Sequence, residues 1–324
     1  MRSHRKLALG AAVLAAALTA AACSSGGGSG SSSSTSPAAS GPSLASTFVF
    51  GAPPDCATNK FCAIGLKNVY GIQFKEVKTT DFGGPVTVSA LKSGSIQVGE
   101  LFSTSVYDPT FVVLNDDKHL EAADNITAVV RTPVASDDVQ SLLNAVDAKL
   151  TTAGMLALNK QVDIDQQNVS DVAKAFLQQN GLLGSPTTSG QGKTLTVGVS
   201  ASFSESKLVA EMYSEVLENA GYTVKRDFSL GSRKVSDTAL FSGKIDIKPE
   251  YLASEAVALD PNAAVSGDTQ NNLQVLTPLE QAKGVTVLTP SAAIDTNVFV
   301  VTKDTATKYN LSNVSDLAKP APSS

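Results

Sequence analysis

Two nine-residue segments of this 324-residue chain repeat one pattern at a spacing of 149 positions. Residues 90–98 read ALKSGSIQV, and residues 239–247 read ALFSGKIDI. Each segment predicts the end of a helix, a glycine that caps the helix, and a short buried strand. The same spacing pairs Phe102 with Tyr251, so each half places an aromatic residue at the end of its repeated strand. The repeat therefore predicts two similar lobes.

Strand-like runs alternate with amphipathic helical runs from residue 47 onward. Such alternation predicts an α/β fold with largely parallel sheets. The polar segment GSPTTSGQGK at 184–193 divides this body and is expected to be a linker. In open α/β sheets, ligands bind at the carboxyl ends of the strands, so Phe102 and Tyr251 predict a ligand cleft between the lobes.

The amino end has the three parts of an export signal. Three Lys or Arg residues within 2–6 precede an apolar run at 7–18, and small residues then lead to Cys23. The apolar run is shorter than the roughly 20 residues of a membrane-spanning helix. Small residues that end on a cysteine resemble the lipobox of bacterial lipoproteins, which predicts a signal peptide at 1–22 and a lipid on Cys23. A plain secretory signal with an incidental cysteine is the alternative.

Residues 24–46 are rich in glycine and serine and carry no charge. A sequence of this composition behaves as a flexible coil. Together with Cys23 it predicts a flexible tether over 23–46 that joins the lipid to the folded body. The expected location is the cell membrane, with the protein lipid-anchored on the extracytoplasmic face.

The charge and the histidine content exclude several functions. A net charge of −5 argues against nucleic-acid binding, because phosphate contacts need a basic surface. The two histidines are His4, in the predicted signal, and His119, which are too few for a His-rich metal site or a Ser-His-Asp triad. The sequence shows no nucleophile–base motif. We therefore expect a protein that is not an enzyme and that uses no metal or cofactor.

Cys56 and Cys62 are the cysteines that remain after Cys23. In an exported protein such a pair predicts a disulfide that closes a short loop. A metal-binding pair of the C-x5-C type is the alternative, although no further cysteine or histidine lies nearby in the sequence.

Nearly all of residues 47–319 resembles one family, the solute-binding proteins of glycine betaine, choline and osmoprotectant ABC transporters. Residues 195–254 resemble the amino-terminal part of that family, and within them GSR…AL…SG.ID..PEY is a fairly specific string. Residues 50–105, which begin FGAPP, resemble the middle of the family. AVVR at 128–131 and the segment 144–183 resemble its carboxyl-terminal part.

The order of these parts differs from that of the family, in which the stretch like 194–319 comes first. The chain therefore resembles a circularly permuted member, and a fusion of two unrelated halves is the alternative. The resemblance implies a two-lobed α/β fold of the type II periplasmic-binding-protein class, with the ligand cleft between the lobes. It places 47–125 and 298–319 in one lobe, called lobe B, and 126–183 and 194–296 in the other, called lobe A.

Family members hold a quaternary ammonium in a cage of tyrosines, and the resemblance implies the site residues here. Tyr251 matches a cage tyrosine, whereas Phe102 and Phe299 stand where the family usually has tyrosine. Asp124 stands where a fourth tyrosine is common, and Asn59 where many relatives have an arginine that clamps a betaine carboxylate. These two changes predict that choline-like cations bind better than betaines.

Two further positions carry polar groups toward the implied site. Ser254 takes the place of a hydroxyl residue that can hydrogen-bond the ligand. Ser200 begins a polar turn, up to Ser204, that opens a helix and can offer backbone amides. Arg233 and Lys234 are interpreted as a solvated helix start.

The resemblance implies a receptor that captures a small cationic or zwitterionic solute, such as glycine betaine, choline or carnitine. Its lobes would close around the solute by a hinge motion, and the closed monomer would dock on an ABC permease in the membrane. A scaffold or sensor lipoprotein that keeps the fold with a degenerate ligand site is the alternative.

Overall fold

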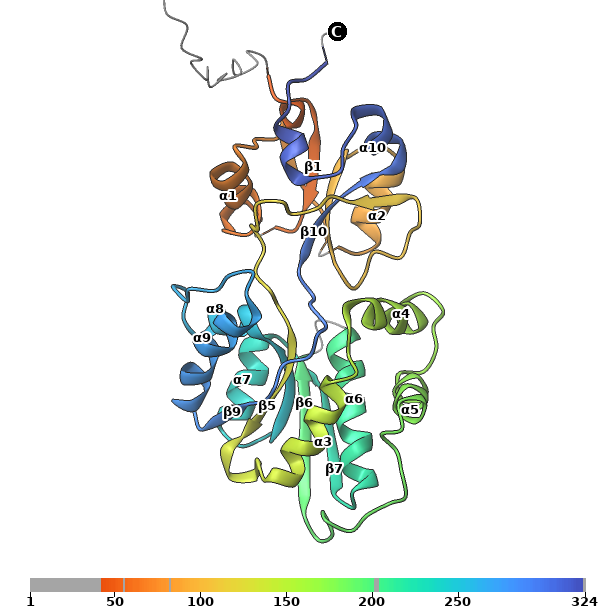
Figure 1. Ribbon diagram of the computed structural model, residues 1–324, viewed down its shortest axis with the longest axis vertical. Helices are drawn as coiled ribbons and strands as arrows, with labels where there is room; N and C mark the ends of the chain where they lie inside the picture. The colour runs from red at the N-terminus through yellow and green to blue at the C-terminus, as the bar shows by residue number, and fades with distance from the viewer. Residues whose placement is uncertain (1–41, 55, 82, 201–203, 323–324) are drawn as a thin grey trace, which may run out of the picture. The chain divides into compact units, whose positions relative to one another are not determined.

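A computed structural model describes residues 42–54, 56–81, 83–200 and 204–322 (Figure 1). The predicted signal peptide and Cys23 lie outside the described residues, as does most of the predicted tether. The folded body begins earlier than the sequence predicted, because Leu44–Thr47 form a 3-10 helix in which Leu44 and Ala45 are buried. Among the described residues, no helix is both long and apolar enough to cross a membrane.

The two five-stranded sheets have the same order of strands. In the sheet of lobe B, β1 pairs in parallel with β2 and β3, and β10 runs antiparallel to β3 and β4. In the sheet of lobe A, β6 pairs in parallel with β7 and β8, and β5 runs antiparallel to β8 and β9. The order in lobe B is β2 (Glu76–Thr79), β1 (Val49–Ala52), β3 (Val98–Phe102), β10 (Asn297–Thr302), β4 (Phe111–Val113), and the order in lobe A is β7 (Thr223–Leu230), β6 (Thr194–Ser200), β8 (Ile247–Tyr251), β5 (Ile126–Arg131), β9 (Val285–Val287).

Helices cover these sheets, and side-chain caps fix where several of them begin. Ser136, Thr151 and Asp268 each accept a hydrogen bond from a backbone N–H in the first turn of the helix that follows. In lobe A, α3 and α6 lie on one side of the sheet and α7 on the other (Figure 1). The α-helices are α1 (Ala63–Gly65), α2 (Pro85–Lys92), α3 (Asp137–Asp147), α4 (Thr152–Asp163), α5 (Val169–Gln179), α6 (Ser204–Asn219), α7 (Arg233–Phe241), α8 (Leu252–Leu259), α9 (Thr269–Gln281) and α10 (Lys303–Tyr309).

The repeat found in the sequence is confirmed as a structural repeat. The last residues of α2 and of α7 are followed by Gly94 and Gly243, whose φ angles of 73° and 77° lie in the left-handed region that favours glycine. The chain then enters β3 or β8, each of which lies at the centre of its sheet. The predicted α/β fold with two similar halves is therefore confirmed.

Each sheet contains one strand that follows, along the chain, the strands of the other lobe. β5 follows the strands β1–β4 of lobe B along the chain but pairs with β8 in lobe A, and β10 follows the strands of lobe A but pairs with β3 in lobe B. The two crossovers that lead into β5 and β10 contact each other. Asn125 and Ile294 form an antiparallel bridge, and the N–H of Asp295 donates to the carbonyl of Asp124 at 3.0 Å. The lobes are thus joined by a short two-stranded hinge.

The ends of the folded body are side by side in lobe B. Ser43 forms an antiparallel bridge with Pro320, and the N–H of Leu44 donates to the carbonyl of Lys319 at 2.7 Å. The segment predicted as a linker packs at the end of α6, where the N–H of Gly190 donates to the carbonyl of Ala220 at 2.9 Å.

Cys56 and Cys62 form a disulfide with their Cα atoms 5.1 Å apart. The bridge closes the loop after β1 and is fully buried in the core of lobe B, beside Phe50 and Leu66. This loop carries Asn59, so the disulfide holds one edge of the predicted site in place.

Candidate functional site

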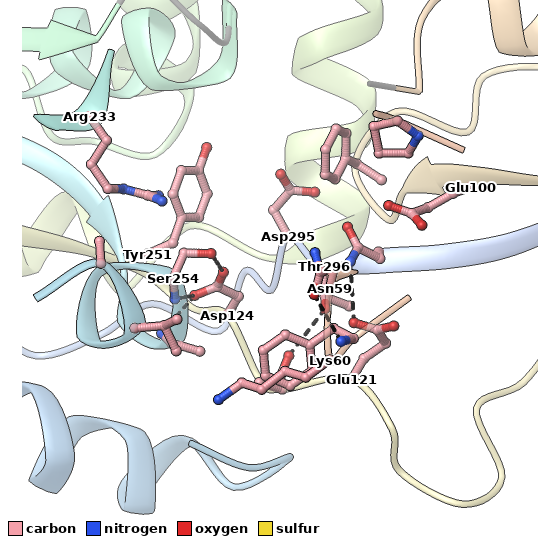
Figure 2. Close-up of a pocket in the computed structure, with 18 of the residues that line it drawn as sticks. Asn59, Lys60, Glu100, Glu121, Asp124, Arg233, Tyr251, Ser254, Asp295 and Thr296 are labelled. Atoms are coloured by element: carbon pink, nitrogen blue, oxygen red, sulfur yellow. Dashed lines mark hydrogen bonds between the residues drawn. The ribbon is translucent and has the colours of Figure 1, made fainter. Parts of the chain in front are cut away.

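A cavity of about 620 Å³ opens at the carboxyl ends of the two repeated strands, β3 and β8 (Figure 2). Both lobes and both crossovers contribute to its walls. Its lining includes Asn59, Lys60, Glu100, Phe102, Glu121 and Asn297 from lobe B, Arg233, Tyr251 and Ser254 from lobe A, and Asp124 and Asp295 from the crossovers.

Phe102 and Tyr251 occupy equivalent places in the two walls. Phe102 ends β3 and pairs with Asn297, and Tyr251 ends β8 and pairs with Ile126. The hydroxyl of Tyr251 donates to Oε1 of Glu205 at 2.8 Å, so the orientation of the ring is fixed. Burial and the neighbouring Glu205 raise the pKa of Tyr251 well above its ordinary value, and the phenol therefore stays neutral.

Behind Tyr251, a buried polar network supports the ring. The side-chain amide of Asn159, in α4, donates to Oε2 of Glu205 at 2.6 Å and to the carbonyl of Thr104 at 3.3 Å. Burial raises the pKa of Glu205. Because Thr104 follows β3 and Asn159 lies in α4, this network links the two lobes beside the cavity.

Asp124 lines the cavity, but its carboxylate accepts hydrogen bonds from other residues of the protein. Oδ1 accepts hydrogen bonds from the N–H groups of Ala253 at 2.7 Å and Ser254 at 3.0 Å, and Oδ2 accepts one from the hydroxyl of Ser254. Asp124 therefore caps the amino end of α8 from a distant part of the chain. The predicted preference for choline-like cations assumed that the carboxylate of Asp124 is available to a ligand. Because this carboxylate already accepts hydrogen bonds from Ala253 and Ser254, the geometry does not support that assumption.

Asp295 is the counterpart of Asp124 on the second crossover. Each aspartate lies two residues before the strand residue that pairs with Phe102 or Tyr251. Oδ1 of Asp295 accepts hydrogen bonds from the hydroxyl of Thr104 at 2.7 Å and from the backbone N–H of Thr104 at 3.4 Å. Asp124 accepts a hydrogen bond from the backbone N–H of Ala253 in the same way. Burial, followed by the nearby Glu205, raises the pKa of Asp295 well above its ordinary value.

Two glutamates make the lobe B wall acidic. Glu100 and Glu121 are both buried, and one oxygen of Glu121 accepts from the side-chain amide of Asn297 at 3.4 Å. Its other oxygen, Oε1, is buried and has no hydrogen-bond partner among the described residues. Burial and the charge of Glu100 raise the pKa of Glu121 well above its ordinary value. A cation in the cavity would offset the cost of ionising these carboxyls.

Two of the predicted ligand residues lie elsewhere. Phe299 is 1% exposed and packs in the core of lobe B, with its ring centroid 5.9 Å from that of Phe50. Asn297, two residues earlier in β10, is the residue that lines the cavity, because it pairs with Phe102 at the end of β3. Ser200 does not line the cavity, and its hydroxyl donates to the carbonyl of Gly231 at 2.9 Å. The rest of the polar turn after it, at 201–203, lies outside the described residues.

The other predicted residues, Asn59, Phe102, Tyr251, Asp124 and Ser254, are brought together in the cavity. Sequence reasoning missed Arg233, Glu100, Glu121 and Asp295. Arg233 had a usable signal, since a helix that precedes a parallel strand begins near the carboxyl end of that strand, where ligands bind. The first residue of α7 is therefore a site residue and not a solvated helix start.

The structure thus has two α/β lobes, a hinge of paired crossovers, and a cavity of aromatic and acidic residues between the lobes. The chain matches the family model of the substrate binding domain of the ABC-type glycine betaine transport system over residues 43–179 and 193–324, and it belongs to that family. The proteins of this family bind substrates for ABC transporters and are not enzymes.

Curated relatives match over shorter stretches. The chain is 30% identical over 117 residues to the glycine betaine-binding protein YehZ of Escherichia coli (strain K12), which is 36% of this chain and 38% of that protein. It is 31% identical over 137 residues to the carnitine transport binding protein OpuCC of Listeria monocytogenes serotype 1/2a, which is 41% of this chain and 44% of that protein. The chain thus spans about two-fifths of the length of the curated relatives it matches.

Solved structures of solute-binding proteins are also similar at low identity. A phosphate-binding protein from Streptococcus pneumoniae TIGR4 is 18% identical with a TM-score of 0.43, over 84% of this chain and 94% of that one. An ancestral arginine-binding protein is 14% identical with a TM-score of 0.38, over 84% of this chain and 92% of that one.

Proposed function

We propose that this protein is the solute receptor of an ABC importer and that it captures a small quaternary-ammonium solute of the glycine betaine, carnitine or choline type. The observation that carries this proposal is the cavity between Phe102 and Tyr251, which also contains the buried carboxyl of Glu121 and the half-buried carboxyl of Asp295. Aromatic rings and desolvated carboxylates are the groups that attract an organic cation.

Capture and delivery follow from the arrangement of the lobes. A solute that contacts both walls favours the closed state over the open state, because only the closed state makes both sets of contacts. The paired crossovers at Asn125 and Ile294 are the place where the backbone would bend. We propose that the closed form then docks on the membrane permease as a monomer, and that a lipid on Cys23 keeps the receptor at the extracytoplasmic face of the membrane.

The test is calorimetry of the purified protein with glycine betaine, carnitine and choline, with arginine and phosphate as comparison solutes. At least one quaternary-ammonium solute should bind at micromolar concentration or better, and at 100 times its Kd it should stabilise the fold by about 2.7 kcal/mol. A protein that melts unchanged with all three, at millimolar concentration, would favour the scaffold or sensor function instead.

A further inference from the structure

Arg233 is placed where it can reach a ligand from lobe A. It is the first residue of α7, it lines the cavity, and Figure 2 shows its guanidinium beside the ring of Tyr251. Its side chain is 30% exposed, so it is not sealed off from the cavity that it lines. The chain therefore supplies a cationic group to the cavity from the wall opposite Asn59, where the resemblance implied an arginine that is absent here.

The guanidinium is held from behind by two carboxyls. Nε of Arg233 lies 3.1 Å from Oε2 of Glu250 and 3.4 Å from Oε2 of Glu255. Among the described residues, the hydrogen bonds and ion pairs of this side chain run through Nε. A guanidinium has five N–H donors, and the four on its two terminal nitrogens have no hydrogen-bond acceptor within the part of the chain that the structure describes.

A buried ion network keeps Glu250 in this position. Nζ of Lys248, 1% exposed, lies 2.7 Å from Oε1 of Glu250 and also pairs with Asp237. Burial raises the pKa of Glu255 to about 10, so this carboxyl keeps its proton at neutral pH. The cations of Arg233 and Lys248 then face the carboxylates of Asp237 and Glu250, and Asp124 also interacts with Arg233 across the cavity wall.

The opposite wall has the complementary character. Phe102, Glu121 and Asp295 offer an aromatic face and acidic groups that suit a cation. A ligand that extends from this side toward Arg233 meets acidic side chains at one end, which a cation would help to ionise, and a guanidinium at the other. Planar guanidinium groups recognise carboxylates through two parallel N–H···O bonds.

We propose that Arg233 binds the carboxylate of a zwitterionic solute and makes the site prefer betaine-type ligands over choline. This inference rests on the proposed function and names the substrate class within it. Arg233 takes the role of an anion clamp, and Glu250 acts as the positioning residue that turns the terminal nitrogens toward the ligand.

Calorimetry with glycine betaine and choline tests the proposal on the wild type and on Arg233→Gln. The variant should lose at least tenfold in affinity for glycine betaine and change less than threefold for choline. Arg226→Gln is the matched control, because Arg226 is equally exposed, pairs with Glu211 and Glu218, and does not line the cavity. It should bind both solutes like the wild type. Equal losses for both solutes in Arg233→Gln, or no loss for either, would overturn the proposal.

A second measurement needs no substitution and covers the case in which Arg233→Gln folds poorly. The amide of glycine betaine has the same trimethylammonium group and nearly the same shape but no negative charge. The wild type should bind this amide at least tenfold more weakly than glycine betaine. Equal affinity for the two would contradict the proposal that Arg233 binds the carboxylate. If the wild type binds neither glycine betaine nor choline, the proposed function fails, which is a different result from either of these.

Discussion

The hydroxyl of Tyr251 donates to Glu205, which fixes how the ring enters the cavity. Tyr251→Ala removes the aromatic face, and a cation over such a face gains about 0.5–2 kcal/mol. We expect the affinity for the best ligand to fall about tenfold or more, since ~1.4 kcal/mol corresponds to a factor of ten. Tyr309→Ala is the control, because Tyr309 packs on Phe48 in lobe B and does not line the cavity. Affinities measured by calorimetry check this, and wild-type affinity in Tyr251→Ala would place the ligand elsewhere.

Asp147 is a buried carboxyl far from solvent, at the end of α3. Its carboxyl accepts hydrogen bonds from the hydroxyl of Tyr213 at 2.5 Å and from the N–H of Ala128 at 3.2 Å, and burial raises its pKa from 3.8 to about 8. Between these two pKa values the folded protein binds a proton that the unfolded chain has released. The contribution of Asp147 to the free energy of unfolding therefore falls as the pH rises from about 4 to about 8.

Asp147→Asn removes this titration. We expect the free energy of unfolding of the variant to rise relative to the wild type by up to about 1.4 kcal/mol per pH unit over that range. Urea unfolding of both proteins at pH 5 and pH 7.5 measures the change. A difference between the two proteins that stays constant with pH would contradict the raised pKa.

At the scale of elements, Asp124 couples a crossover to a helix that lies 128 or more residues away in sequence. Asp124→Ala leaves the N–H groups of Ala253 and Ser254 without this acceptor, and losing a cap costs about 0.5–2 kcal/mol. We expect a loss of that size in the free energy of unfolding, measured in urea. Asp165→Ala removes an exposed ion pair with Lys160 and should change stability by less than about 0.5 kcal/mol. Equal stability of Asp124→Ala and the wild type would show that the cap contributes nothing.

The elements themselves were largely predictable, because the period of the hydrophobic pattern and the glycines after α2 and α7 are local signals. The register of β10 was not. Asn297 and Phe299 point to the same face of the strand, since side chains alternate along it, and only the pairing with β3 decides which of them reaches the cavity. The partner of Asp124 was equally hidden, because a long-range cap leaves no pattern in the neighbouring sequence.

The site residues also fall into two groups, those that a local sequence signal predicts and those whose position depends on the tertiary fold. Tyr251 and Ser254 were found because they follow a repeated strand. Glu121 lies in an irregular segment between β4 and β5, where no periodicity predicts burial, and its place in the cavity depends on how the crossover folds back.

At the scale of the whole molecule, the permuted order is a proposal that the folded ends make testable. The family model matches in two blocks, 43–179 and 193–324, and the bridge between Ser43 and Pro320 places the ends of the body side by side. A rearranged chain that starts at residue 193, joins residue 322 to residue 42 through a short Gly/Ser linker, and ends at residue 183 should fold and bind the same ligand. Circular dichroism and calorimetry measure both properties.

Loss of the fold in that rearranged chain would show that the present order of the halves is required. A control in which the same Gly/Ser linker is inserted between residues 186 and 187 of the original order separates this outcome from an effect of the linker. The control should retain the fold and the affinity.

The repeat relates the two walls of the cavity by an approximate two-fold symmetry, and Arg233 is one of the residues that break it. Phe102 corresponds to Tyr251, and Asp295 corresponds to Asp124 on the paired crossovers. At the same spacing of 149 positions, Arg233 corresponds to Gly84, which has no side chain to reach a ligand. A fully symmetric cavity would hold a solute equally well in two reversed orientations. With an arginine on one side only, the cavity has a head and a tail, and a solute with unlike ends enters it in a single direction.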